Sequence, residues 1–222
     1  AGVNYYDGQG FMVSKSLGVK SALELDGAAV CIQAGTTTEL NLADYFRLNG
    51  MSYKSVTYDT SDATVKGFEA GRCDVLTSDQ SQLYALRIKL ADPSSAMVLP
   101  NVISKEPLGP LVRQGDDQWF NIVKWTLFAL VNAEELGITA ANVDAMKTGS
   151  KDPNVRRLLG AEGNFGEAMG LGADWAYQAV KQLGNYGEMF ERNLGSYTPL
   201  GIARGLNALW RDGGLMYAPP SR

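Results

Sequence analysis

Three consecutive threonines stand where an apolar run gives way to a helical pattern. The segment reads Cys31-Ile-Gln-Ala-Gly-Thr-Thr-Thr-Glu-Leu40, with one glycine before the three hydroxyl side chains. Threonine disfavours helix interiors, but Thr36 followed three residues later by Glu39 is typical of a capping box at a helix start. The first interpretation of the segment is therefore a helix cap and nothing more.

The second interpretation is a binding site for an anion. The first turn of a helix carries unpaired backbone N–H groups and the positive end of the helix dipole, so phosphate or carboxylate binds there readily. Gly35 would let the backbone approach a ligand closely, and the Thr37 and Thr38 hydroxyls would add donors. Both interpretations remain open at this point.

A second junction of the same kind ends in an aspartate. Cys73-Asp-Val-Leu-Thr-Ser-Asp79 has the pattern of a strand, and a helical pattern begins at Gln80. Asp79 either caps that helix or presents a free carboxylate. The carboxyl ends of parallel strands lie along one edge of a sheet, where ligands bind. If the two junctions meet there, the helix start suits an α-carboxylate and Asp79 suits an α-ammonium, which together describe a zwitterion.

The elements that must position these junctions alternate along the first hundred residues. Strands are predicted at residues 10–13, 28–33, 55–58, 73–77 and 96–99, and helices at residues 21–25, 36–48, 61–70 and 79–90. Strands alternating with helices of about ten residues are typical of βαβ units and a mostly parallel sheet. The expected class is therefore α/β.

The pattern changes after Pro100. Pro107, Gly109 and Pro110 indicate an extended segment, and the sequence is helical in character from Asp116 almost to its end. Helices are predicted around residues 119–131 and at residues 140–146, 155–159, 174–193 and 202–210. The boundary near residues 100–110 predicts two differently built regions.

Composition excludes several classes of function. The 222 residues carry a net charge of −4 with no long basic run, so a nucleic-acid partner is not expected. There is no histidine, which excludes Ser-His-Asp and Cys-His catalysis and makes a zinc enzyme improbable. No apolar run has the length needed to span a bilayer, and no cofactor is expected. The two cysteines, Cys31 and Cys73, are by themselves consistent with two buried thiols.

Three segments in order resemble the periplasmic amino-acid-binding proteins of ABC transporters, extracellular solute-binding protein family 3. They are Tyr5-Tyr-Asp-Gly-Gln-Gly10, Gly35-Thr-Thr-Thr-Glu39 and Gly71-Arg-Cys-Asp-Val-Leu-Thr-Ser-Asp79. The likeness is greatest to the general L-amino-acid-binding branch, whose members have a long C-terminal extension like that after Leu136. It implies an exported protein in the periplasm, with its signal peptide removed, that binds an L-amino acid and delivers it to a membrane permease.

The resemblance also implies an architecture. It predicts a type II periplasmic-binding-protein lobe with a mostly parallel sheet, followed by a helical C-terminal region. Residues 1–6 would form the first hinge strand, residues 7–103 the complete second lobe and residues 104–110 the second hinge strand. Residues 111–222 would hold the C-terminal part of the first lobe and the helical extension.

The resemblance assigns roles to the matching positions. Thr37 would bind the ligand carboxylate with Gly35, Thr36 and Thr38 around it, and Asp79 would bind the ammonium. Gln33 would line the pocket for the ligand side chain. Export would place the cysteines in an oxidising compartment, so a disulfide between Cys31 and Cys73 becomes possible.

The chain departs from the family in one respect. Members begin with a longer segment that builds most of the first lobe and holds an arginine that binds the ligand carboxylate. No arginine here matches that position. We therefore expect either a truncated chain that lacks an N-terminal fragment or an intertwined homodimer, with Trp119, Trp125 and Phe128 exposed unless a partner covers them.

Two alternatives to a transport protein remain. The same scaffold serves cyclohexadienyl dehydratases, whose chemistry needs a general acid or base in the cleft. Glu39 is the only carboxylate expected near Asp79, and the capping box explains it better. The other alternative is a naturally truncated interaction or structural protein without a ligand.

Overall fold

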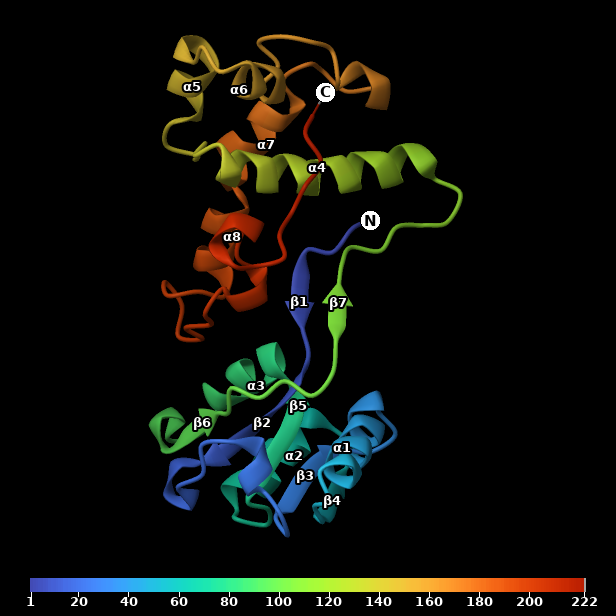
Figure 1. The fold of residues 1–222 in the computed structure, drawn as a ribbon, viewed down its shortest axis with the longest axis vertical. Coiled ribbons are helices and arrows are strands. Elements are labelled where there is room, and N and C mark those ends of the chain that lie inside the picture. Colours follow the sequence, from blue (N-terminus) through green and yellow to red (C-terminus); the bar gives the residue numbers. More distant parts are fainter. Residues whose placement is uncertain (222) are drawn as a thin grey trace. The chain divides into compact units, whose positions relative to one another are not determined.

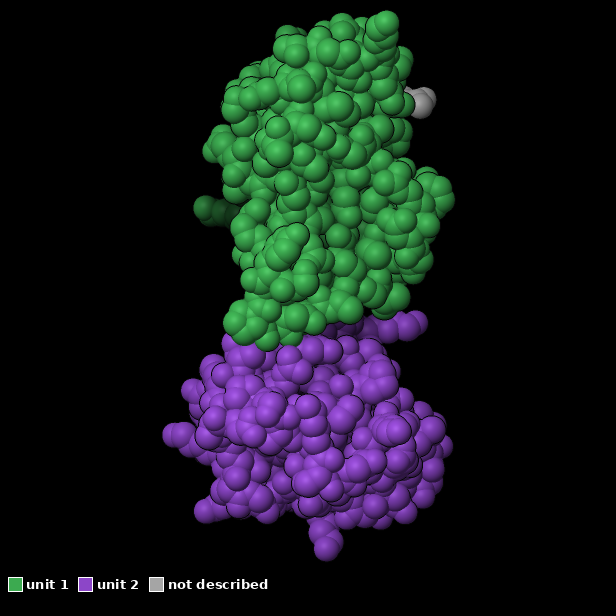
Figure 2. All heavy atoms as spheres, turned by 90° about the vertical axis from the view of Figure 1, so that its left-hand side faces the viewer, with its two compact units in different colours: residues 1–6, 107–222 green, residues 7–106 purple. Residues whose placement is uncertain are grey.

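The computed structural model describes residues 1–221. The chain divides into two compact units, named here unit 1 (Ala1–Tyr6 and Pro107–Arg222) and unit 2 (Asp7–Glu106), which Figure 2 colours green and purple. Two short strands join them, β1 (Tyr5–Asp7) and β7 (Glu106–Leu108), and these pair side by side as a two-stranded sheet (Figure 1).

Unit 2 is built on a five-stranded sheet in the order β4-β3-β5-β2-β6. Its strands are β2 (Gln9–Ser14), β3 (Ala29–Gln33), β4 (Lys54–Tyr58), β5 (Val75–Asp79) and β6 (Ala96–Val98). β3 is parallel to β4 and β5, whereas β2 is antiparallel to β5 and β6. The predicted α/β fold is confirmed, but the sheet is mixed rather than mostly parallel, because two of its four strand pairings are antiparallel. β2 is the opposed strand because it follows β1 directly and enters the sheet where β5 ends.

Side chains of unit 2 alternate between two apolar layers, as the two-residue period of a strand requires. Phe11, Val30 and Ile32 pack on one face with α1 (Thr37–Leu48). Met12, Cys31 and Leu76 pack on the other face, where α2 (Ser61–Glu69) and α3 (Gln80–Arg87) contribute their buried residues. The sheet therefore lies between one helix and a pair of helices. The helix predicted at residues 21–25 is a single 3₁₀ turn, Ala22–Glu24.

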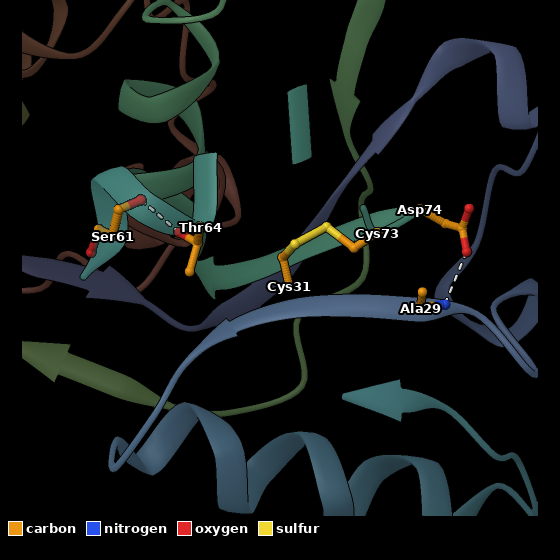
Figure 3. The surroundings of a disulfide bond; sticks show 6 residues. All are labelled: Ala29, Cys31, Ser61, Thr64, Cys73 and Asp74. Carbon is orange, nitrogen blue, oxygen red and sulfur yellow. Dashed lines mark hydrogen bonds between the residues drawn. A yellow bond between two sulfur atoms is a disulfide. The ribbon is translucent and has the colours of Figure 1, made fainter. Parts of the chain in front are cut away.

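The two cysteines join neighbouring strands inside the second of these layers. Cys31 of β3 and Cys73, just before β5, form a disulfide whose Cα atoms lie 5.6 Å apart (Figure 3). Beside it, the Asp74 carboxylate accepts a hydrogen bond of 2.9 Å from the Ala29 N–H. The covalent bond and the hydrogen bond together fix β5 against the strand that leads into the threonine segment.

Unit 1 is helical. It contains α4 (Asp117–Glu135), α5 (Val143–Gly149), α6 (Pro153–Leu158), α7 (Trp175–Leu183) and α8 (Tyr186–Asn193) (Figure 1). Its core gathers the buried side of α4, including Ala129, Leu130 and Val131, against residues of the other helices. None of the helices within residues 1–221 is both long and apolar enough to cross a membrane.

Two helix predictions in unit 1 are wrong. The helix predicted at residues 174–193 is interrupted, because Gly184 has a positive φ of 80° and Asn185 starts a new helix with a complete capping box to Glu188. The helix predicted at residues 202–210 is replaced by the 3₁₀ turn Gly205–Asn207 and the start of a second one, Trp210–Asp212. In the first turn, the buried Asn207 side chain accepts from the N–H of Tyr6 and donates to its carbonyl, so a tertiary contact overrides the local pattern.

The aromatic residues of α4 are less exposed than expected. Trp119 is 52% exposed, in agreement with the expectation. Trp125 and Phe128 are partly buried, and their ring centroids lie 5.5 Å apart in an edge-to-face contact. Phe165 covers Trp125 from a loop at 4.7 Å. Aromatic pairs within unit 1 therefore shield two of the three side chains.

Candidate functional site

Three strand-to-helix junctions of unit 2 open on one cavity of about 250 Å³. They are the ends of β3, β4 and β5 with the starts of α1, α2 and α3. The lining residues are Gln33, Thr36, Thr37, Thr38, Ser61, Thr64, Thr77, Ser78, Asp79, Gln82, Leu86 and Glu106. Five of the six predicted ligand-binding residues are brought together here. The sixth, Gly35, forms the adjoining turn with a φ of 70° and does not line the cavity.

The threonine segment does not form the predicted capping box. Thr36 is the N-cap residue of α1 but its side chain accepts no cap hydrogen bond, because its hydroxyl donates to the Gln33 carbonyl at 2.9 Å. Glu39 accepts a 3.2 Å bond from the N–H of Gly35 rather than from that of Thr36. The prediction is wrong because both side chains bond the turn that precedes the helix.

With this arrangement, two backbone N–H groups at the start of α1 have no hydrogen-bond acceptor among the described residues. Within residues 1–221, the N–H groups of Thr37 and Thr38 donate to no protein group. Both residues line the cavity, where the helix dipole places partial positive charge. The helix start can therefore bind a carboxylate through two backbone N–H groups and neighbouring hydroxyls.

The side chain of Asp79 also does not cap its helix. It occupies the N-cap position of α3, yet its side chain accepts no cap hydrogen bond within the described residues. Asp7 performs part of that task instead, since its carboxylate accepts bonds from both the N–H and the hydroxyl of Ser81. The Asp79 carboxylate lies on the cavity wall within hydrogen-bonding distance of Glu106, which removes the interpretation that it only caps its helix.

Glu106 is a second carboxylate of the cavity, which sequence reasoning missed. Its carboxylate accepts a 3.0 Å hydrogen bond from the Ser104 hydroxyl. Burial raises the pKa of the Glu106 carboxyl above its usual value, the Ser104 bond partly opposes this, and nearby Asp79 and Asp7 raise the pKa further. The expectation that Glu39 is the only carboxylate near Asp79 is therefore wrong. Within residues 1–221, two charged side chains line the cavity, Asp79 and Glu106, and both are acidic.

The wall formed by α2 and α3 is uncharged but rich in hydrogen bonds. Ser78 donates to the Gln82 carbonyl oxygen, Gln82 donates to Ser61 at 3.2 Å, and Ser61 donates to Gln33 at 3.0 Å. The Gln33 amide ends the series on the Asp59 carbonyl at 3.3 Å. Gln33 therefore lies in a polar network that can orient the polar groups of a ligand side chain.

The sequence carried a signal for some of the cavity-lining residues that were not predicted. Ser61, Ser78 and Gln82 stand at the ends of predicted strands or in the first turn of predicted helices, and therefore at the same edge of the sheet as Asp79. Glu106 gave no such signal, because it belongs to the strand that leaves the unit. Within residues 1–221, no group of His, Cys, Asp and Glu side chains is arranged to hold a metal ion.

No protein-family model matches the chain, but whole proteins do. The general L-amino acid-binding periplasmic protein AapJ of Rhizobium johnstonii is 60% identical over 222 residues, covering 99% of this chain and 65% of AapJ. The glutamate/glutamine/aspartate/asparagine-binding protein BztA of Rhodobacter capsulatus is 54% identical over 220 residues, with coverages of 99% and 65%. The chain thus spans about 65% of the length of these curated relatives.

A solved structure shares the fold along the whole chain. It is an ABC transporter periplasmic binding protein from Brucella ovis with glutathione bound, and it is 54% identical to this chain. The TM-score is 0.92, and the match covers 100% of this chain and 70% of the Brucella chain.

Proposed function

This chain belongs to the family of periplasmic binding proteins of amino-acid ABC transporters, and we propose that it is all or part of the component that binds L-amino acids for such a transporter. Its partners would be the amino-acid ligand and the transporter's permease, and its location the periplasm. The Cys31–Cys73 disulfide supports that location, since disulfides persist in oxidising compartments.

One observation carries this proposal: the donors and acceptors of a zwitterion site line a single cavity. The N–H groups of Thr37 and Thr38 would bind the α-carboxylate, with the threonine hydroxyls adding donors. Asp79 would accept hydrogen bonds from the α-ammonium. An ammonium has three N–H donors, so Glu106 can accept from it as well.

The ligand side chain would lie toward the polar network of α2 and α3. Gln33, Ser61 and Gln82 present amide and hydroxyl groups there, each already oriented by a hydrogen bond. Such a wall favours polar side chains, because an apolar group would leave buried polar atoms without new partners. The names of AapJ and BztA support a range of amino acids that includes acidic and amide side chains.

Calorimetry on this chain tests the proposal. We expect heat of binding with L-glutamate and none with glutarate, which lacks only the amine. Asp79→Asn should weaken L-glutamate binding by about tenfold to a hundredfold, since a hydrogen bond to a charged group contributes about 1.5 to 3 kcal/mol. Asp44→Asn is the matched control, because Asp44 is an exposed carboxylate of the same unit that pairs with Arg47.

Two outcomes would contradict this assignment. Equal binding of L-glutamate and glutarate would show that the site does not recognise the ammonium. Unchanged affinity in the Asp79→Asn variant would remove the residue from the site. Turnover of prephenate or arogenate in the same samples would instead favour the dehydratase alternative, for which Glu106, with its raised pKa, is the candidate acid.

A further inference from the structure

Gln9 is a buried polar residue next to the cavity but not part of its lining. It starts β2, lies directly opposite Asp79 in the strand register, and is 0% exposed. Its amide nitrogen donates to the carbonyl oxygen of Thr38 at 3.0 Å and to the hydroxyl oxygen of Thr77 at 3.0 Å. One side-chain nitrogen therefore joins the first turn of α1 to β5.

The orientation of this amide is fixed by the chemistry of its partners. The Thr38 carbonyl can only accept, so the NH₂ group of Gln9 must face it. The Thr77 hydroxyl gives its own proton to the Gly10 carbonyl at 2.8 Å and therefore accepts from Gln9. The side-chain carbonyl oxygen of Gln9 is buried without a partner within residues 1–221, so the two donated bonds define the position of the amide group.

The backbone of Gln9 is held from a separate segment. Its main-chain N–H donates to the Ser104 hydroxyl oxygen at 2.9 Å, and its main-chain carbonyl accepts from the Ile103 N–H at 2.8 Å. Because the main chain is anchored, movement of the side chain is restricted to its own torsions. Gln9 can therefore act as a fixed link between the two elements that it bonds.

We propose that Gln9 is a positioning residue that sets the distance between the carboxylate-binding start of α1 and the ammonium-binding Asp79. This inference rests on the proposed function. Thr38 belongs to the helix start, and Thr77 lies two residues before Asp79 on the same face of β5. Because the side-chain nitrogen of Gln9 bonds both Thr38 and Thr77, the distance between the two halves of the site is fixed. The site then favours ligands whose ammonium and carboxylate are attached to the same carbon, so it selects α-amino acids over β-amino acids.

Two isomers test this selection by calorimetry. L-Glutamate and β-glutamate (3-aminopentanedioate) have the same atoms and charges, but β-glutamate has one more carbon between amine and carboxylate. Gln9→Met keeps the length of the side chain and removes both donated bonds, and Gln9→Glu replaces the donor with an acceptor. We expect the ratio of L-glutamate to β-glutamate affinity to fall by about tenfold in both variants.

Matched variants separate positioning from loss of stability. Val13→Ala removes a buried side chain from the same strand and should lower the melting temperature without changing the ratio. Thr77→Val removes the acceptor of Gln9 and should lower the ratio, whereas Thr77→Ser keeps the acceptor and should preserve it. A ratio that stays constant in Gln9→Met and Thr77→Val, while both affinities fall together, would overturn the proposal.

Hydrogen exchange distinguishes failure of this inference from failure of the proposed function. If the unmodified chain binds neither isomer, the proposed function fails, and Gln9 is then tested without ligand. Gln9→Met should accelerate exchange of the Leu42 amide, whose helical acceptor is the Thr38 carbonyl, by about tenfold relative to the amides at the end of α1. Uniform exchange along α1, as expected for Val13→Ala, would overturn the positioning role.

Discussion

The two carboxylates of the cavity differ in their surroundings although they face the same space. Asp79 lies at the end of β5 and at the N-cap position of α3. Glu106 is at the junction of the two units' sequences, where burial and the neighbouring carboxylates disfavour its ionised form. An α-ammonium bound between them in the proposed site would relieve that repulsion, and would thereby link ligand binding to the charge of Glu106.

Replacement of Glu106 by glutamine should therefore stabilise the ligand-free chain in a pH-dependent way. Because the folded-state pKa of Glu106 is raised above its usual value of 4.5, ionisation destabilises the fold as pH rises through that raised value. Glu106→Gln should raise the free energy of unfolding at pH about 7, and the difference should vanish below pH about 4. Urea denaturation across this range measures it.

An exposed glutamate of the same unit is the control for this measurement. Glu24→Gln should leave the unfolding free energy nearly unchanged at every pH, since Glu24 is exposed. If Glu106→Gln instead destabilised the chain at neutral pH, the carboxylate would have to be paired with a cation, against the geometry described above.

At the scale of elements, the start of α1 forms the carboxylate-binding part of the proposed site. The residue pattern predicted the helix, its first turn and its place at the sheet edge, because periodicity and turn residues are local signals. It did not predict that Thr36 and Glu39 would bond the preceding turn, since that choice depends on side-chain torsions. Nor did it predict Gln9 or Glu106, because their contacts join segments far apart in sequence.

The backbone donor of Thr37 can be removed without loss of the helix. Thr37 is the first residue of α1, a position that proline favours, and the preceding Thr36 is extended with φ −107° and ψ 161°. Thr37→Val should lower L-glutamate affinity by about tenfold through loss of the hydroxyl, and Thr37→Pro by about a further tenfold through loss of the N–H. Calorimetry measures both values.

Circular dichroism of the same variants provides the control, because helix content should be the same in both. Equal affinities of Thr37→Val and Thr37→Pro would show that this N–H does not contact the ligand. In that case the carboxylate would have to be bound elsewhere in the cavity.

At the scale of the whole molecule, each unit has its own hydrophobic core. The core of unit 1 is assembled from α4 and the helices that follow it, and that of unit 2 from the two faces of its sheet. All four tryptophans, Trp119, Trp125, Trp175 and Trp210, belong to unit 1, and the disulfide belongs to unit 2. The unfolding of the two units can therefore be followed separately.

Loss of the disulfide should affect only one unfolding transition. Cys31→Ala with Cys73→Ala removes a crosslink across 42 residues, which should cost about 2 to 4 kcal/mol. We expect the melting temperature of unit 2, followed by circular dichroism, to fall by about 10 °C or more. The melting temperature of unit 1, followed by tryptophan fluorescence, should not change. If both transitions moved together, the two units would unfold as one cooperative body.

The pairing of β1 with β7 has a consequence for the order of events during synthesis. All of unit 2 is translated between the first residues of unit 1 and the rest of that unit. Closing a flexible loop of about 100 residues costs about 4 kcal/mol of chain entropy. If unit 2 folds on the ribosome as soon as Glu106 has emerged, β1 is already held where β7 can pair with it during translation. Unit 2 would then act as a template for the folding of the helices translated after it.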